Sequence, residues 1–387
     1  VSAEYYSRAN LKASQRPFSK NQDHRAIVAG YDASGNPIAG RDLRLAWGEP
    51  AVVQAQGGTV AGNFNAIPGI RVVLVPEGAT ATPAVGQFIP STTIASGTAV
   101  NAAFQRRGNT ASYIDLIPAS ERYGVSASLN YAIGKNMEFY ARYSHSNTKG
   151  HLETQPALST ASASSGFGNF STLIPAAMNP FNQNVIVGLI HYQFGSIWQD
   201  SETDADSALV GATGVIGDNW EWDSAISWQK QKYDTRRRDF NGAAITAALN
   251  NADASLRLNP FVDQRAPGAL NQTAIYETMA RYSTLAADSE DVSVDLTADG
   301  DLFDIWGGLV QMATGVFFDR SENSSVAVNV SEAVVPVTST ATASGERDSY
   351  AAFVEFAVPL FGKPNSAPLL RRLDLQLAAR YEDRDQA

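Results

Sequence analysis

Few side chains in this chain could carry chemistry. The four histidines include no pair spaced four residues apart, and none has carboxylates at metal-ligand spacing. They are His24, His145, His151 and His191. His145 continues the apolar side of its segment, which favours a role at an interface over metal ligation. The chain has no cysteine, which excludes a disulfide framework and cysteine-ligated zinc.

The acidic run Asp200–Asp206, with the sequence DSETDAD, superficially resembles a calcium loop. It lacks the spaced Asp/Asn ligands, central glycine and closing glutamate of an EF-hand, so we expect a solvated loop. Neither a GxxxxGK[ST] phosphate loop nor a G-x-S-x-G elbow occurs. The sequence therefore predicts no catalytic residue, no metal site, no cofactor and no enzyme activity.

The net charge is −10 and the pI is about 4.9, which argues against a nucleic-acid partner because phosphate affinity requires clustered Lys and Arg. The one tight basic cluster is Arg236–Arg237–Arg238. It has two interpretations: a solvated strand end, or a contact with phosphorylated lipid head groups.

The elements that position these groups are long alternating segments. Ser120–Ile133 and Met137–Thr148 flank the tight turn Gly134–Lys135–Asn136, and each alternates between apolar and polar side chains. A period of two puts successive side chains on opposite faces of a strand. Both segments exceed the five or six residues of an average globular strand and suit a tilted membrane crossing.

Three further hairpins repeat the pattern. Their arms are 207–216 with 220–232 around Gly217–Asp218–Asn219, 291–298 with 306–318 around Asp299–Gly300–Asp301, and 349–360 with 373–383. Long loops are expected at 19–118, 149–183, 234–288 and 321–345, with a short strand at 185–194 and helical pieces near 242–250 and 269–280. With an opening strand at 1–7, this gives about nine long strands.

Short turns that alternate with long loops are typical of outer-membrane barrels, whereas soluble sandwiches have more even spacing. No run of about 18 apolar residues exists, which excludes a transmembrane helix. We therefore predict an all-β fold: part of an antiparallel transmembrane β-barrel with long extracellular loops, in which residues 1–387 form part of a single barrel domain.

If the apolar faces meet lipid, the alternate residues line the lumen. The lumen-facing candidates for substrate contact are Arg122, Glu138, Arg142, Asp295, Glu355, Asp374 and Arg380, with hydration of the wall and contact with a plug as the more ordinary role. The candidate aromatic girdle residues are Tyr123, Tyr143, Trp220, Trp222 and Tyr350. Loop aromatics such as Trp47, Phe167 and Phe170 could act as ligand platforms or simply pack the loops.

Several short strings resemble the TonB-dependent receptors of Gram-negative outer membranes. They are NPFN at 179–182, LNPF at 258–261, ADGDLFDI at 298–305, SYAAFVEFAVPL at 349–360 and LDLQLAARYED at 373–383. The strand after the third turn departs from the family pattern at Phe318 and Asp319. No TonB box, plug domain or closing aromatic strand is found, so the resemblance covers an internal part of the barrel.

This resemblance implies TonB-energised uptake of a scarce nutrient (a siderophore complex, a cobalamin or an oligosaccharide) across the outer membrane. The implied partners are outer-membrane lipid, the nutrient ligand and the TonB energising complex, which would act through the missing plug segment. The alternative interpretations are a passive porin or an outer-membrane adhesin barrel, and then a soluble β-rich secreted protein.

Overall fold

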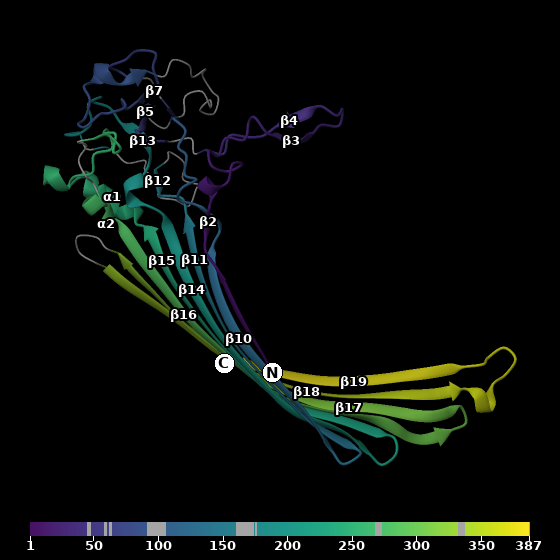
Figure 1. The fold of residues 1–387 in the computed structure, drawn as a ribbon. Coiled ribbons are helices and arrows are strands. Elements are labelled where there is room, and N and C mark those ends of the chain that lie inside the picture. The colour runs from purple at the N-terminus through teal and green to yellow at the C-terminus, as the bar shows by residue number, and fades with distance from the viewer. Residues whose placement is uncertain are drawn as a thin grey trace.

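The computed structural model is dominated by one nine-stranded antiparallel sheet (Figure 1). The structure describes residues 1–44, 48–57, 60–61, 64–90, 106–159, 174, 176–267, 273–331 and 337–386. The strand order is β1-β10-β11-β14-β15-β16-β17-β18-β19. The strands of this sheet therefore lie side by side in the order in which they occur in the sequence. The prediction of an all-β protein with about nine long strands is confirmed.

The strands of this sheet are long. Their bounds are β1 Ser2–Arg8, β10 Ala119–Ile133, β11 Met137–Thr154, β14 Ile197–Ile216, β15 Trp220–Phe240, β16 Ala280–Ile305, β17 Gly308–Ser331, β18 Val337–Phe361 and β19 Leu373–Gln386. Four of them exceed 20 residues, several times the length of an average globular strand.

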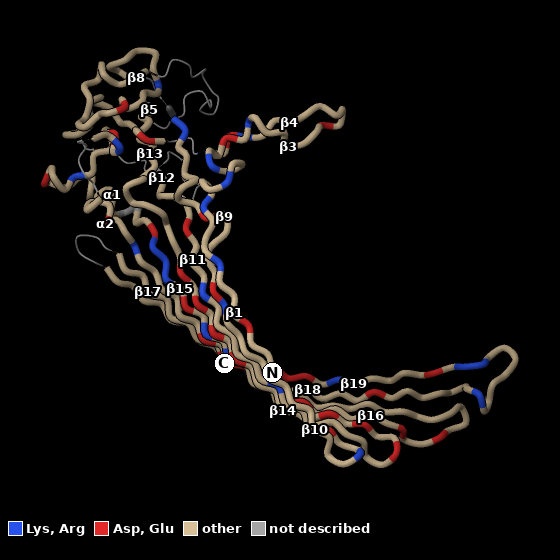
Figure 2. Tube along the Cα trace, viewed as in Figure 1, with Lys and Arg blue, Asp and Glu red and all other residues tan. Residues whose placement is uncertain are grey.

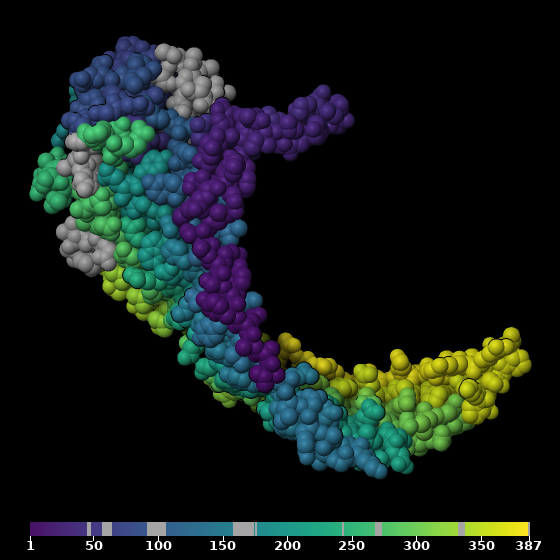
Figure 3. Space-filling model, viewed as in Figure 1, coloured from purple at the N-terminus to yellow at the C-terminus, as the bar shows by residue number. Residues whose placement is uncertain are grey.

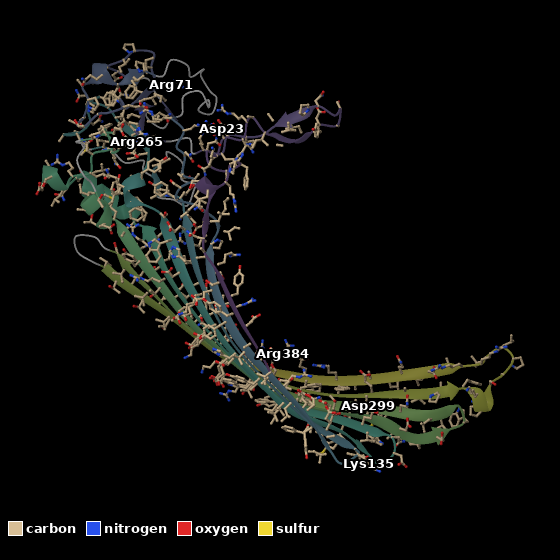
Figure 4. All side chains as sticks on the ribbon, in the orientation of Figure 1. Asp23, Arg71, Lys135, Arg265, Asp299 and Arg384 are labelled. Carbon is tan, nitrogen blue, oxygen red and sulfur yellow. The ribbon has the colours of Figure 1, made fainter. Side chains whose placement is uncertain are left out.

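The first two hairpin turns lie where the sequence predicts them. Gly134 and Gly217 both adopt φ of 69°, a left-handed conformation that glycine accepts without a Cβ clash. The predicted third turn is wrong. Asp299, Gly300 and Asp301 continue β16, and the chain reverses at Trp306–Gly307 instead. Figure 4 shows Asp299 along the strand, well short of the hairpin tip.

Several segments expected as loops are strands, including 149–154 in β11, 234–240 in β15 and 280–288 in β16. Residues 321–331 and 337–345 extend β17 and β18, which pair with each other from Ser331↔Val337 downward. Residues 200–206 belong to β14, paired with β11 on one side and β15 on the other. At 319–325 both faces of β17 are polar, which interrupts the hydrophobic alternation, and the alternation resumes with Val326, Val328 and Val330 on one face while the backbone pairing continues.

The long connections fold together into a loop unit at one end of the sheet (Figure 1). Its sheet has the order β12-β13-β5-β7-β8, with β6 beside β5. The bounds are β5 Val52–Gly57, β6 Val60–Ala61, β7 Val72–Leu74, β8 Ile89–Pro90, β12 Leu158–Ser159 and β13 Val185–Ile190. The predicted strand at 185–194 is thus β13, followed by a 3₁₀ turn at Tyr192–Phe194, and it pairs with β5 far away in the sequence.

Two helices complete this unit, α1 Gly242–Leu249 and α2 Thr273–Glu277, close to the predicted helical pieces. Two short pairs join it to the wall and extend from it: β2 Leu11–Lys12 with β9 Asp115–Ile117, and β3 Val28–Tyr31 with β4 Pro37–Ala39. The hydrophobic core lies in the loop unit, because its buried cluster is formed mainly by residues of these connections.

The two NPF strings serve this core in the same way. Asn179 Oδ1 accepts the backbone N–H of Phe181, and Asn259 Oδ1 accepts that of Phe261, each at 3.0 Å. These Asx turns direct both phenylalanine rings inward, where both are buried and contact Phe88.

Among the described residues, no second layer covers the nine-stranded sheet. Figure 3 shows it as a curved wall that is hollow on one side. None of the described helices is long and apolar enough to cross a membrane.

Candidate functional site

The register of the sheet brings the predicted apolar side chains onto one face. One row of partners crosses seven strands and is apolar throughout: Leu129, Ala141, Val210, Ile226, Val294, Phe318 and Tyr350. In this row Leu129 is 55%, Val210 48% and Ile226 56% exposed. A contiguous exposed apolar face of this extent marks a surface that meets another apolar phase.

This apolar band runs obliquely across the strands. Met137, beside the first turn, pairs with Gly214, but β14 continues to Ile216 before it turns. Trp220 pairs with Gly300, but β16 continues to Ile305. The edge of the band nearest the loop unit shifts in the same direction. It is marked by Tyr123 in β10 and by Tyr381 in β19. Tyr381 lies in the same row of paired residues as Tyr131, which is eight positions closer to the turn than Tyr123.

The shift averages about one residue per strand along the pairing direction. With a rise of about 3.3 Å per residue and a strand separation of about 4.8 Å, that slope corresponds to a strand tilt of about 35°. Strands of closed barrels tilt by about 35–45°, so both the turns and the apolar band follow the geometry of a barrel wall.

Aromatic side chains mark both edges of the band. Trp220 and Trp222 lie at the turn end, and Tyr123, Tyr143 and Tyr350 lie toward the loop unit. At the edge toward the loop unit, the hydroxyl and indole N–H groups of two aromatic rings donate to carboxylates on the same face that lie one side chain closer to the loop unit. Tyr143 Oη donates to Asp206 at 2.9 Å, and Trp228 Nε1 donates to Glu290 at 2.9 Å. A ring in an apolar zone with its polar tip directed to water is the arrangement found at membrane interfaces.

Above this edge the same face is charged, and Figure 2 shows acidic and basic residues gathered there along the strands. The pairs span neighbouring strands: His145–Asp206 at 2.9 Å, Lys149–Glu202 at 3.1 Å, His151–Asp200 at 2.6 Å and Lys230–Glu290 at 2.7 Å. His145 thus lies just above the band edge. Among the described residues, no group of three potential ligands could hold a metal ion.

The arginine cluster divides between three roles. Arg236 lies between the rings of Trp198 and Tyr282, and Arg237 pairs with Asp239 at 3.1 Å. Arg238 is buried, donates to the Phe194 carbonyl at 2.8 Å and pairs with Glu277 at 3.1 Å. The interpretation of a solvated strand end is therefore wrong for Arg238, which fastens the loop unit to β15.

The opposite face of the sheet carries the seven lumen candidates. The register puts all of them on this face: Arg122, Glu138, Arg142, Asp295, Glu355, Asp374 and Arg380. They do not form one cluster. Arg122 pairs with Glu4 at 3.1 Å, Glu138 accepts Asn130 at 2.6 Å, and Arg380 pairs with Glu382 at 3.3 Å. Such exposed neighbouring pairs contribute little to stability and keep the wall polar.

A feature of this face that the sequence pattern did not indicate is the contact of Tyr140 with Gly211. Tyr140 interrupts the alternation of its strand, and its ring crosses β14 at Gly211 to reach β15, where its hydroxyl donates to Asp223 at 3.0 Å. A Cβ at position 211 would stand 2.3 Å from the Tyr140 ring. Phe353 lies over Gly315 in the same way, 5.9 Å from the ring of Phe317. An aromatic residue out of phase with its strand was the available signal.

A groove of about 780 Å³ lies at the upper ends of six strands, β1 to β16. Charged residues line much of it, including Arg8, Glu121, Lys149, His151, Asp200 and Arg236. None of the seven lumen candidates lines it. The loop aromatics Trp47, Phe167 and Phe170 lie outside the described residues.

Fold and surfaces together define an all-β protein built on a large curved antiparallel sheet. No protein-family model matches the chain, and no curated protein matches it. Among solved structures, it is similar to the closed form of the ferric-catecholate import receptor Fiu from E. coli K12. The identity is 14% and the TM-score 0.33, over 70% of this chain and 40% of that one. The chain therefore spans less than half the length of that receptor. At this level of similarity, the conclusions below depend on the sheet itself.

Proposed function

We propose that this chain forms part of the wall of a transmembrane barrel in the outer membrane of a Gram-negative bacterium. The observation that carries the proposal is the exposed apolar band, which crosses the sheet with the slope of tilted barrel strands. Fully burying a leucine, valine or isoleucine side chain contributes roughly 1.5–3 kcal/mol, so a band of this size is stabilised strongly by acyl chains.

The two edges of the sheet also favour a larger closed barrel. β1 and β19 each pair with one partner only among the described strands. Unpaired strand edges are not tolerated in a bilayer because their N–H and C=O groups find no water there. Additional strands of the same protein would close the wall, and the polar face would then line a water-filled interior.

We further propose that this barrel takes up a scarce nutrient with energy from the TonB complex. The supporting features are the NPF strings and the order of the hairpin strings described above. The ligand would be a siderophore complex, a cobalamin or an oligosaccharide, captured by the loop unit. TonB would pull on a plug that fills the barrel. The process is binding and gated passage without bond chemistry, so the protein is not an enzyme.

The test uses the complete gene in its native host. We expect a protein in the outer-membrane fraction whose gel mobility changes on heating, because folded barrels resist detergent unfolding. Deleting the gene should abolish growth on one scarce nutrient, and deleting the TonB gene should cause the same loss. Uptake that persists without TonB would instead indicate a passive porin, and surface adhesion without uptake would indicate an adhesin. A protein that stays dispersed in detergent-free buffer would overturn the membrane assignment itself.

A further inference from the structure

The loop unit contains a buried carboxyl group with no hydrogen-bond partner. Glu49 is only 4% exposed, and neither of its carboxyl oxygens has a hydrogen-bond donor. The backbone N–H of Gln264 lies close by without completing a hydrogen bond. A buried, unpaired carboxylate is costly, so a group in this position favours its neutral form.

Gln264, whose backbone N–H lies near Glu49, also has a buried side-chain oxygen without a donor. Its side-chain Nε2 donates to Tyr276 Oη at 2.7 Å, while its buried Oε1 has no donor. Tyr276 Oη lies 2.9 Å from His191 Nδ1. Buried acceptors without a donor therefore occur on Glu49 itself and on the neighbouring residue Gln264. Protonated Glu49 carries a donor of its own and removes the buried charge, and no metal-ligand group exists among the described residues to compete with this solution.

Charged and titratable groups face Glu49 from every segment around it. Arg265 and Asp263 act on it from 261–267, but they pair with each other at 3.0 Å. Burial raises the pKa values of Tyr113, Tyr192 and Tyr276, on three other segments, and all three lie close enough for the charge of Glu49 to raise these values further. Arg106 is nearby and is occupied by the carbonyls of Pro50 and Val75. No cation in this described neighbourhood is directed at Glu49 alone.

Glu49 also lies where the loop unit is fastened to the wall. The 3₁₀ turn Tyr192–Phe194 contacts the Glu49 surroundings through Tyr192 and accepts Arg238 of β15 through the Phe194 carbonyl. α2 supplies Tyr276 on one side and Glu277, the ion-pair partner of Arg238, on the other. Figure 4 shows the labelled Arg265 within this unit, at the loop end of the strands.

We propose that Glu49 is a proton-binding site whose ionisation loosens the junction between the loop unit and the sheet. Protonated Glu49 keeps the junction closed, and loss of the proton leaves an uncompensated buried charge that favours an open form. The inference concerns the loop unit alone and does not depend on the proposed transport function.

The sign and size follow from proton linkage. Burial raises the pKa of Glu49 from 4.5 to about 7, Arg265 lowers it and Asp263 raises it. Because the closed form holds the proton more tightly than the open form, closure is favoured fully below pH 4.5 and loses that advantage as pH rises through 7. The ratio of open to closed forms should rise roughly forty-fold between pH 5 and pH 7 from this group alone.

His191 acts in the opposite direction, since burial lowers its pKa from 6.5 to about 3. The pH profile of the wild type alone therefore mixes two effects. Comparison with Glu49→Gln separates them, because the variant keeps His191 and replaces the acid by a neutral group of nearly the same shape that always carries donors.

The experiment is hydrogen–deuterium exchange of the full-length protein in detergent, on peptides covering 48–57 and 185–195, at pH 5, 6, 7 and 8. The wild-type to Glu49→Gln exchange ratio cancels the intrinsic effect of pH. It should rise roughly forty-fold from pH 5 to pH 7 and then level off. Glu77→Gln, which removes an exposed acid of the same unit, should leave the profile unchanged. A ratio constant within about two-fold would overturn the proposal.

Infrared titration of protein labelled with ¹³C-glutamate gives a second readout that needs no variant to fold. A protonated carboxyl band should persist to near pH 7. The absence of any such band above about pH 5, where ordinary glutamates are ionised, would contradict the proposal.

Discussion

Arginine substitutions at two neighbouring positions of β19 distinguish the two faces of the sheet. Leu377 is the central residue of the apolar series Leu373, Leu375, Leu377, Ala379 and Tyr381, and it is 51% exposed. It pairs with Phe356, while Gln376, one residue away on the other face, pairs with Ala357. Gln376 lies one position from Leu377 and directly opposite Ala357, so Gln376→Arg is a matched control for Leu377→Arg on the other face.

The expected magnitude depends on what covers each face. An arginine at the bilayer midplane of a barrel costs about 2–4 kcal/mol, whereas surface substitutions in contact with water usually stay within about 0.5 kcal/mol. We expect Leu377→Arg to reduce the free energy of unfolding by about 2–3 kcal/mol more than Gln376→Arg, a factor of roughly 30 to 150 in the unfolding equilibrium.

The assay is denaturant unfolding of the full-length protein from lipid vesicles, followed by tryptophan fluorescence and by heat-dependent gel mobility. Equal effects of the two substitutions would refute the assignment of the apolar face to lipid. A larger effect of Gln376→Arg would show that the faces are reversed.

Three further predictions concern the wall and its attachment to the loop unit. Gly211→Ala should lower the free energy of unfolding by about 1–3 kcal/mol, because the added Cβ would stand 2.3 Å from the Tyr140 ring. The double variant Gly211→Ala with Tyr140→Ala should recover part of this loss in the same unfolding assay. No recovery would contradict the contact. In a Glu49→Gln background, the contribution of His191 to the stability of the loop unit should be fully present above pH 6.5 and fall as pH drops toward 3, because burial lowers the pKa of His191 to about 3. Adding His191→Gln should abolish this pH dependence in hydrogen exchange. An unchanged pH dependence would assign the effect to another group. Arg238→Met should speed proteolysis of the loop unit by at least ten-fold while heat-dependent mobility of the barrel persists, because it removes the contacts with Phe194 and Glu277. The control is Arg237→Met, whose side chain pairs with half-buried Asp239 on the same strand. Equal proteolysis of the two variants would argue against the fastening role.

The sequence predicted the sheet well where one face is apolar. In the hairpin around Gly134, β10 has nearly the predicted bounds and β11 begins at Met137 as predicted, although it continues to Thr154 instead of ending at Thr148. Alternation of apolar residues fixes both the strands and their register. At 319–325 both faces of β17 are polar, so the hydrophobic period is interrupted there, and only the short alternation of Val326, Val328 and Val330 could have indicated that the strand continues. The acidic run at 200–206, expected as a loop, does alternate: its four acids share one face of β14, and this alternation of charge could have indicated a strand.

The misplaced third turn has a different cause. Asp299–Gly300–Asp301 has the composition of a turn, but Gly300 is needed because the Trp220 ring lies against it, with a Cβ at that position only 2.8 Å from the indole. Asp301 is held in the sheet by the Trp220 indole N–H, which donates to its carbonyl at 3.0 Å. Single-sequence patterns cannot separate a glycine required by a turn from one required by a neighbouring ring.

The loop unit and the Glu49 site lay beyond sequence reasoning for a further reason. β5 pairs with β13, more than 120 residues later, and Glu49 meets Gln264 across more than 200 residues. Contacts of such separation leave no local periodicity in the chain. The seven lumen candidates share one face as predicted, and their role in substrate contact stays a prediction.

The most direct test of the two-faced wall uses a probe with a single attachment point. The chain contains no cysteine, so one cysteine introduced at Leu129 or at Ser128 labels a single known position. In lipid vesicles, a quencher dissolved in the acyl chains should strongly reduce the fluorescence of a probe at position 129 and leave a probe at 128 nearly unaffected. Quenching at 128 and not at 129, or equal quenching at both, would contradict the account.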